Sequence, residues 1–456
     1  MDRTRNKIKK FFNPSRFVVL SFAFTILLGS LILSLPGTHR IHTSYIDSLF
    51  MSTSAVCVTG LSLFNISKDF THFGQYTILL LFQIGGLGLM TFSVFFLFIL
   101  RKDISMVSID TVFNTFSNNK KIRYQELIKL IITFTLLFEA IGAALLFLFF
   151  LFHENYSLFN SFYYGVFHSI SAFCNAGFSL FPDSFVRFER NSFFNIIITT
   201  LIIIGGIGFI VILEIYYRFR NKIKLFSLHT KLTVSVTLIL IIIGTLTIYF
   251  IEKDHLFIAE NYTTTRALMT SFFQSVTART AGFNTVNIEN LSPATLFFII
   301  ILMFIGASPG STGGGIKTTT AGIMFAIFIN RLKGKQNIKL FNRTIGQETI
   351  SRTISIILSS VILLTLTFMI LIYINQTATW FKGNNSIIKI LFEEISAFGT
   401  VGLSTGITPQ MDTATKIITI LLMFIGRVGP LALAVAIVGD SKEDKIKYSE
   451  ENIMVG

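Results

Sequence analysis

Six long stretches of this chain contain no Asp, Glu, Lys or Arg, and they constrain the fold more than any other feature. They cover residues 17–39, 70–100, 191–213, 232–251, 290–316 and 353–381. A helix needs about 20 predominantly apolar residues to cross a bilayer, and each stretch is long enough. Only 14% of all residues are charged, against roughly 25% in soluble domains. The sequence therefore predicts an all-α integral membrane protein and excludes a soluble enzyme or a disulfide scaffold.

The basic residues predict the orientation of the chain in the membrane. Of the 38 Lys and Arg residues, 26 lie in five short segments. These segments are the predicted cytoplasmic parts: 1–16, 101–129, 218–231, 330–352 and 439–456. Lys and Arg accumulate on the cytoplasmic side of membrane proteins, so both termini are expected in the cytoplasm. Since the net charge of +14 is spread over islands between apolar runs, it does not indicate nucleic-acid binding.

Between the basic segments, one pattern recurs four times. A long apolar helix is followed by a shorter and more polar helix, a glycine-centred turn and a second long helix. The four units are predicted at 17–100, 130–217, 232–329 and 353–438, and their short helices at 45–56, 160–173, 264–278 and 386–398. Apolar pieces of 10 to 14 residues suit re-entrant segments better than spans. The predicted fold therefore has eight full spans and four re-entrant pore helices.

The turns after the short helices resemble one another closely. They read SAVCVTGLS (54–62), SAFCNAGFS (171–179), TARTAGFN (277–284) and SAFGTVGLS (396–404). Because every unit begins and ends in the cytoplasm, the units are parallel repeats related by an axis along the membrane normal. The turns should then lie at one depth around that axis. Irregular backbone at membrane depth is tolerated only where it is buried or lines a water-filled cavity, so the sequence predicts one pseudo-fourfold pore.

The residue types in the turns indicate what passes through this pore. The turns carry no carboxylate, so their ligands would be main-chain carbonyls with Thr and Asn oxygens, which suit a dehydrated monovalent cation. The partly negative C-terminal end of each short helix also favours a cation. The predicted ion-binding residues, where K⁺ would be the metal bound, are Val58, Thr59, Gly60, Leu61, Asn175, Ala176, Gly177, Phe178, Thr280, Ala281, Gly282, Phe283, Thr400, Val401, Gly402 and Leu403.

At this point the chain resembles the Trk/Ktr/HKT potassium transporters, in particular the Ktr-type translocating subunit. The resemblance covers about 16–438 and is carried by the four turn glycines, GSTGGGIKT (310–318) and GRVGP (426–430). It implies a K⁺-conducting subunit in the bacterial plasma membrane that has no enzymatic activity. It also implies a homodimer, surrounded by membrane lipid, on a cytosolic ring of nucleotide-binding RCK-type regulatory subunits. Nucleotide would then act only through that partner, and Na⁺ would be a candidate coupling ion.

The third unit contains a candidate gate. Its second long helix, 294–329, is interrupted by GASPGSTGGGIKTTT (306–320), and Gly and Pro at this density break a helix. The resemblance implies an intramembrane loop that gates the pore. Charges inside a membrane span indicate function by default, and two such charges occur here. The predicted gate residues are Gly306, Ser311, Thr312, Gly313, Gly314, Gly315, Lys317 and Arg427.

Three alternatives compete with potassium uptake as the function of this sequence. A sodium or non-selective carrier of the same fold is disfavoured by Gly60, which some sodium-selective plant relatives replace by serine. A membrane enzyme or proton-coupled carrier would need paired intramembrane carboxylates or histidine clusters, whereas the carboxylates here are isolated. ATP binding by GSTGGGIKT is disfavoured because a phosphate-binding loop has Lys directly after Gly, and Ile316 separates them here.

Overall fold

A computed structural model describes the backbone of residues 14–100, 124–221, 223, 225–376, 378, 381 and 386–438. Side chains are described for residues 16–88 and, apart from the same gaps, for residues 127–435. The long helices are α2 (Pro14–Leu33), α5 (His72–Leu100), α7 (Tyr124–Phe152), α11 (Leu228–Glu252) and α16 (Gln347–Asn375). The predicted cytoplasmic segments 1–16 and 101–129 lie mostly outside the described residues, and 439–456 lies wholly outside them.

Shorter helices follow the long ones in a regular order. After α2, α7, α11 and α16 come α3 (Tyr45–Val56), α8 (Leu158–Phe173), α13 (Thr264–Thr277) and α17 (Ser386–Gly399). The last helices of each unit are α5, then α9 (Ser192–Ile207) with α10 (Phe209–Phe219), α14 (Pro293–Phe304) with α15 (Thr318–Leu332), and α18 (Thr413–Val428) with α19 (Pro430–Val438). The starts and ends of the four short helices agree with the sequence prediction to within two residues.

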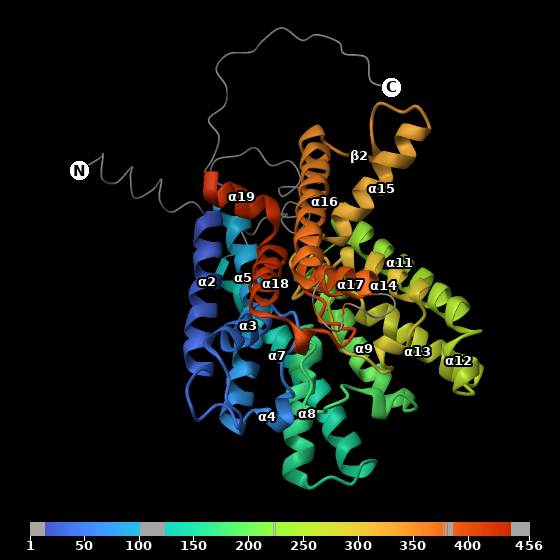
Figure 1. Ribbon diagram of the computed structural model, residues 1–456. Helices are drawn as coiled ribbons and strands as arrows, with labels where there is room; N and C mark the ends of the chain where they lie inside the picture. Colours follow the sequence, from blue (N-terminus) through green and yellow to red (C-terminus); the bar gives the residue numbers. More distant parts are fainter. Residues whose placement is uncertain are drawn as a thin grey trace.

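A few small elements complete the described chain. They are the single turns α4 (Ile66–Asp69) and α12 (Leu256–Ala259), and 3₁₀ turns at Val186–Phe188, Ile288–Asn290 and Thr408–Gln410. Strand β1 (Lys339–Leu340) pairs antiparallel with β2 (Arg343–Thr344) between α15 and α16. This hairpin lies at the end of the molecule where α16 begins (Figure 1).

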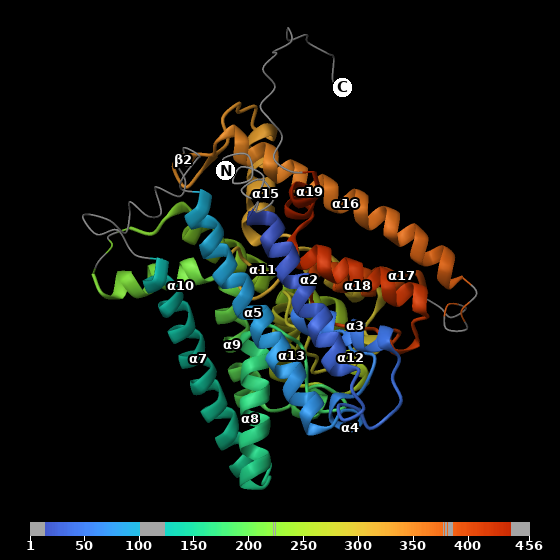
Figure 2. The ribbon, with the colours of Figure 1, turned by 90° about the vertical axis from the view of Figure 1, so that its left-hand side faces the viewer.

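The short helices link the units into a closed circle. Each packs on the long helix before it, as Figure 2 shows for α7 and α8. Each also packs on a helix of the preceding unit: α8 on α5, α13 on α9, and α17 on α14. The circle closes because α18, from the last unit, packs on α3, from the first (Figure 1). Segments more than 350 residues apart in the sequence are thereby brought side by side.

Several helices in the described part of the chain are long and apolar enough to cross a membrane. They cover Arg16–Leu33, Leu127–Phe152, Leu228–Glu252 and Gln347–Asn375, and the bent pair α9–α10 is a fifth candidate. Many of their large apolar side chains face outward, such as Phe24 and Phe152 at 67% and 74% exposure. Outward apolar faces fit a lipid environment, so the fold is that of a multi-pass membrane protein. The count of eight spans stays a prediction.

Two long helices that the sequence predicted as continuous are broken in the structure. The helices predicted at 193–217 and 414–438 are interrupted at Gly208 and Gly429, both with a φ of 94°. A residue with a side chain rarely adopts this backbone conformation. At Gly208 the two halves meet at 98°, and the amide of Phe209 donates to the carbonyl of Gly310, 3.0 Å away. At Gly429 the next residue is Pro430, which cannot donate a helical hydrogen bond.

Candidate functional site

The four glycine turns have the same backbone shape. A residue with a side chain occupies the left-handed region two positions before each glycine: Val58 (φ 56°), Asn175 (57°), Thr280 (71°) and Thr400 (49°). The glycines themselves follow at φ 88°, 72°, 78° and 92° in chain order. Such conformations are uncommon outside glycine, and here they recur at equivalent positions in all four units. The turns therefore share a conformation that their differing side chains do not dictate.

The four glycines also lie against one another in cyclic order. A Cβ atom on Gly60 would lie 2.6 Å from the carbonyl oxygen of Ala176, and one on Gly177 would lie 3.0 Å from that of Ala281. A Cβ atom on Gly282 would lie 2.4 Å from the carbonyl oxygen of Val401, and one on Gly402 would lie 2.1 Å from that of Thr59. Each turn thus contacts the next, and the last contacts the first. The structure brings all sixteen predicted ion-binding residues together around one point.

Hydroxyl groups of the short helices hold these turns from behind. Ser54 Oγ donates to the carbonyl of Leu61 (2.7 Å), Ser171 Oγ to that of Phe178 (2.8 Å) and Thr277 Oγ1 to that of Phe283 (2.6 Å). In the fourth unit the bond is reversed, since Ser396 Oγ accepts from the amide of Gly402 at 3.1 Å. The carbonyls that follow three of the glycines are therefore bonded to the pore helices. The sequence prediction did not assign this role, although Ser or Thr begins each turn motif.

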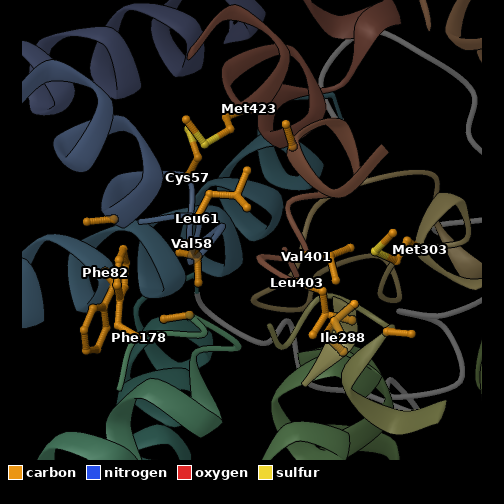
Figure 3. Packing of buried hydrophobic residues seen from close by; sticks show 14 of the residues in the cluster. Cys57, Val58, Leu61, Phe82, Phe178, Ile288, Met303, Val401, Leu403 and Met423 are labelled. Carbon is orange, nitrogen blue, oxygen red and sulfur yellow. The ribbon is translucent and has the colours of Figure 1, made fainter. Parts of the chain in front are cut away.

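The apolar side chains of the turns are buried away from solvent. Val58, Leu61, Phe178, Val401 and Leu403 are each at most 1% exposed. Figure 3 shows them packed with residues of the surrounding helices, among them Phe82, Met303 and Met423. With these apolar side chains occupied in packing, the groups that the turns can offer to an ion are main-chain carbonyls and the side-chain oxygens of their Thr and Asn residues.

A loop between α14 and α15 lies against the inner end of the turns. It runs from Ile305 to Lys317, so it begins one residue earlier than predicted and ends three residues earlier, because Thr318 already begins α15. The amide of Gly314 donates to Thr400 Oγ1 at 2.9 Å. A Cβ atom on Gly313 would lie 2.1 Å from Thr280 Oγ1. The loop backbone fits beside these two hydroxyls because it carries no side chain at either glycine.

Further hydrogen bonds tie this loop to the second and fourth units. Thr312 Oγ1 lies 3.3 Å from the carbonyl oxygen of Phe173 and 3.2 Å from that of Gly205. The amide of Gly315 donates to the carbonyl of Gly426 at 3.1 Å. Inside the loop, the amide of Gly306 donates to Ile316 and Ser311 Oγ donates to Ser308, at 2.8 and 2.6 Å. The loop is thus held by hydrogen bonds to the second and fourth units.

Two cationic side chains bond the same loop. Arg427 is 2% exposed and donates through Nη1 to the carbonyl of Thr312 and through Nη2 to that of Gly85, 2.7 Å away. Lys317 Nζ donates to the carbonyls of Gly313 (2.7 Å) and Gly314 (3.4 Å). Neither cation forms an ion pair with a carboxylate within the described residues. Their positive charges are therefore compensated by carbonyl dipoles, and the guanidinium carbon of Arg427 also lies 5.9 Å from the centre of the Phe22 ring. All eight predicted gate residues belong to this loop or contact it.

Comparisons with known proteins identify the family to which the chain belongs. A family model described as TrkH, a cation transport protein, matches residues 5–447. The chain is 36% identical over 464 aligned residues to the Ktr system potassium uptake protein B of Bacillus subtilis, with all of both chains covered. It is 35% identical over 456 residues to the potassium/sodium uptake protein NtpJ of Enterococcus hirae, with 99% of each covered.

A solved structure shares the fold. The crystal structure of the potassium transporter TrkH from Vibrio parahaemolyticus superposes with a TM-score of 0.73 over 92% of this chain and 84% of that one, at 18% sequence identity. The match of the family model to nearly the whole sequence, together with full-length relatives above 30% identity, shows the family directly. The chain belongs to the TrkH family of cation transport proteins.

Proposed function

We propose that this protein is the potassium-conducting subunit of a Ktr-type uptake system in a bacterial plasma membrane. The observation that carries the proposal is the cyclic contact of Gly60, Gly177, Gly282 and Gly402, each lying against a carbonyl of the next turn. The printed functions of the Bacillus and Enterococcus relatives, potassium and potassium/sodium uptake, support it. The distribution of Lys and Arg supports a cytoplasmic position for both termini.

The four turns act as the selectivity filter in this proposal. A K⁺ ion sheds its water onto main-chain carbonyls, among them those of Thr59, Ala176, Ala281 and Val401 beside the glycines. The C-terminal ends of α3, α8, α13 and α17 meet these turns, and their dipoles favour a cation over an anion. Without a carboxylate ring the site favours a monovalent ion. The four tandem parallel repeats supply one turn each.

The loop from Ile305 to Lys317 acts as the gate. It lies next to the inner side of the turns and is held by Thr400, Phe173 and Gly205. Arg427 and Lys317 add two positive charges on the path that an ion takes after the filter. Breaking the bonds of Arg427 to Thr312 and Gly85 would release the loop and lower the electrostatic barrier together.

A sodium or non-selective carrier of the same fold is the second candidate function. The name of the Enterococcus relative, which includes sodium, favours it. The glycine at each of the four filter positions favours potassium, and Na⁺ then enters as a coupling ion in symport. As partners we propose a second copy of the chain and a cytosolic nucleotide-binding regulatory ring, contacted through the basic cytoplasmic segments.

Rubidium uptake in a bacterial host that lacks its own potassium systems tests the proposal. The unsubstituted chain should restore growth at low potassium and accumulate Rb⁺ in preference to Na⁺. Gly60→Ser should lower this preference, because its side chain would press on the carbonyl of Ala176. Gly37→Ser is the matched control, since a Cβ atom at Gly37 meets nothing within 4 Å. Growth without Rb⁺ or K⁺ uptake would refute the assignment. An equal preference for Rb⁺ over Na⁺ in Gly60→Ser and Gly37→Ser would also refute it.

A further inference from the structure

A buried carboxyl group lies directly behind the second filter turn. Glu139, in the middle of α7, is 5% exposed. Its Oε2 accepts from Gln83 Nε2 of α5 at 3.0 Å, and its Oε1 lies 3.8 Å from Cys174 Sγ. Cys174 Sγ also donates to Gln83 Oε1 at 3.1 Å. These three side chains come from three different elements and form a hydrogen-bonded triad, in which the single thiol hydrogen of Cys174 reaches one acceptor at a time and Gln83 lies 3.1 Å away against 3.8 Å for Glu139. Glu139 forms no ion pair in the described residues.

The equivalent place in two other units holds an aliphatic side chain. In the second unit Ser169 Oγ donates to the carbonyl of Glu139 at 2.7 Å. Ser52 makes the same bond to Ile26 in the first unit, and Ser275 to Ile241 in the third, at 2.7 and 3.0 Å. Packing of a long helix on a short one therefore does not require a carboxyl group here. A carboxyl inside a membrane span is costly, and its presence indicates a function.

The triad holds the point where the filter and the gate meet. Cys174 caps the end of α8 and directly precedes Asn175, the filter residue with a φ of 57°. The carbonyl of Phe173, one residue earlier, accepts from Thr312 of the gate loop. A Cβ atom on Gly86 would lie 2.9 Å from Cys174 Sγ and 3.7 Å from Thr312 Cγ2, so the two groups lie close together. One short segment is thus fixed from behind by Glu139 and contacted from below by the loop.

We propose that Glu139 is a positioning residue for ion discrimination. Through Gln83 and Cys174 it fixes the end of α8, which keeps Asn175 in its left-handed conformation at the ion pathway and keeps the carbonyl of Phe173 available to Thr312. Discrimination by the second turn and closure of the loop then depend on the same three side chains. This inference rests on the proposed function, because it assigns the triad a role in selecting the ion that the pore conducts.

Two substitutions at one position test the inference. Glu139→Ile installs the residue that the first and third units carry, leaves Gln83 Nε2 without its acceptor and removes the second acceptor of Cys174. We expect the ratio of Na⁺ to Rb⁺ uptake to rise about fivefold, the lower end of typical coupling between sites. Glu139→Gln keeps an oxygen that accepts from Gln83, so its ratio should stay close to that of the unsubstituted protein. The ratio is compared at equal amounts of protein in the membrane.

A matched control separates this role from general loss of a buried carboxyl group. Glu252 is also fully buried in a long helix, where it accepts from the amide and hydroxyl of Ser292 at 2.9 and 2.8 Å, and Glu252→Gln should leave the ion ratio unchanged. If the Glu139→Ile protein does not reach the membrane in usable amounts, Gln83→Leu removes the same hydrogen bond between Gln83 and Glu139. Gln83→Leu must then raise the ratio of Na⁺ to Rb⁺ uptake instead. A double mutant of Glu139→Ile with Thr312→Val should show non-additive uptake rates, as expected for side chains that act on one segment.

The outcomes distinguish this inference from the proposed function. If the unsubstituted chain carries no Rb⁺, the proposed function fails and the inference fails with it. If the unsubstituted chain carries Rb⁺ while Glu139→Ile, or Gln83→Leu in its place, keeps the normal ion ratio, only the inference is overturned. An equal rise for Glu139→Ile and Glu252→Gln would also overturn it, since the effect would then belong to any buried carboxyl group.

Discussion

Replacing Arg427 should open the gate. Its guanidinium donates to the carbonyls of Thr312 in the loop and Gly85 in α5. A hydrogen bond from a charged group contributes about 1.5–3 kcal/mol. Loss of the single bond to the loop therefore shifts the loop towards its released position by at least about 1.5 kcal/mol, which is roughly tenfold in population. Removal of the positive charge from the ion path acts in the same direction.

Three variants separate the two contributions. Arg427→Gln removes the charge and should raise the maximal Rb⁺ uptake rate about tenfold, with the concentration for half-maximal uptake little changed because the filter is intact. Arg427→Lys keeps the charge but cannot bridge two carbonyls with a planar fork. Its maximal uptake rate should therefore lie between those of the unsubstituted protein and Arg427→Gln. Arg331→Gln is the control, since Arg331 lies exposed in the last turn of α15.

The assay is initial Rb⁺ uptake over a range of Rb⁺ concentrations, normalised to the amount of protein in the membrane. The substitution also leaves two buried carbonyls without a donor, so the thermal unfolding of purified protein should be recorded alongside. A well-folded Arg427→Gln protein with an unchanged maximal rate would refute both the bonding and the electrostatic role. A lower rate would show that Arg427 supports conduction instead of closure.

Three further predictions follow from single contacts. Gly402→Ala should abolish selective Rb⁺ uptake, because its Cβ atom would lie 2.1 Å from a carbonyl oxygen at a φ of 92°, whereas Gly37→Ala should transport normally. Thr400→Val keeps the side-chain shape but removes the acceptor for the amide of Gly314, 2.9 Å away. Cells loaded with Rb⁺ should therefore lose it faster than cells with the unsubstituted protein after a rapid drop in external potassium. Glu189→Gln should lower the unfolding temperature of purified protein without changing the ion ratio, since Glu189 accepts from Arg266 at the junction of the second and third units; a changed ratio would contradict its structural role.

The sequence predicted the parts of the fold that rest on local signals. The short helices begin after Ser44, Ser157 and Thr263, whose side chains accept from first-turn amides, so contacts close in sequence fix these helix starts. The turns were found because four similar motifs recur at nearly equal spacing. Residues that carry the same motif in every unit can therefore be assigned to one site from the sequence alone.

The parts that could not be predicted depend on contacts between distant segments. Gly88, Gly208 and Gly429 hold the same place in the motifs GGLG, GGIG and GRVG, yet α5 continues through Gly88 while the other two glycines break their helices. At Gly208 a Cβ atom would lie 2.5 Å from the carbonyl oxygen of Pro309, a contact with a loop about a hundred residues away. The bond between Gln83 and Glu139 likewise joins helices of different units, and no periodicity signals it.

The shared shape of the four turns has a consequence for how the protein tolerates substitution. Val58, Asn175, Thr280 and Thr400 differ in size and polarity, yet their φ angles all fall between 49° and 71°. Apart from Thr280 and Thr400, whose hydroxyls lie against the gate loop, these positions should therefore accept varied side chains in a saturation scan. Almost every change at the four turn glycines should be rejected. Each glycine contacts the following turn, so a substitution that distorts one turn should also distort the other three. The sequences of the four units are therefore not free to change independently of one another.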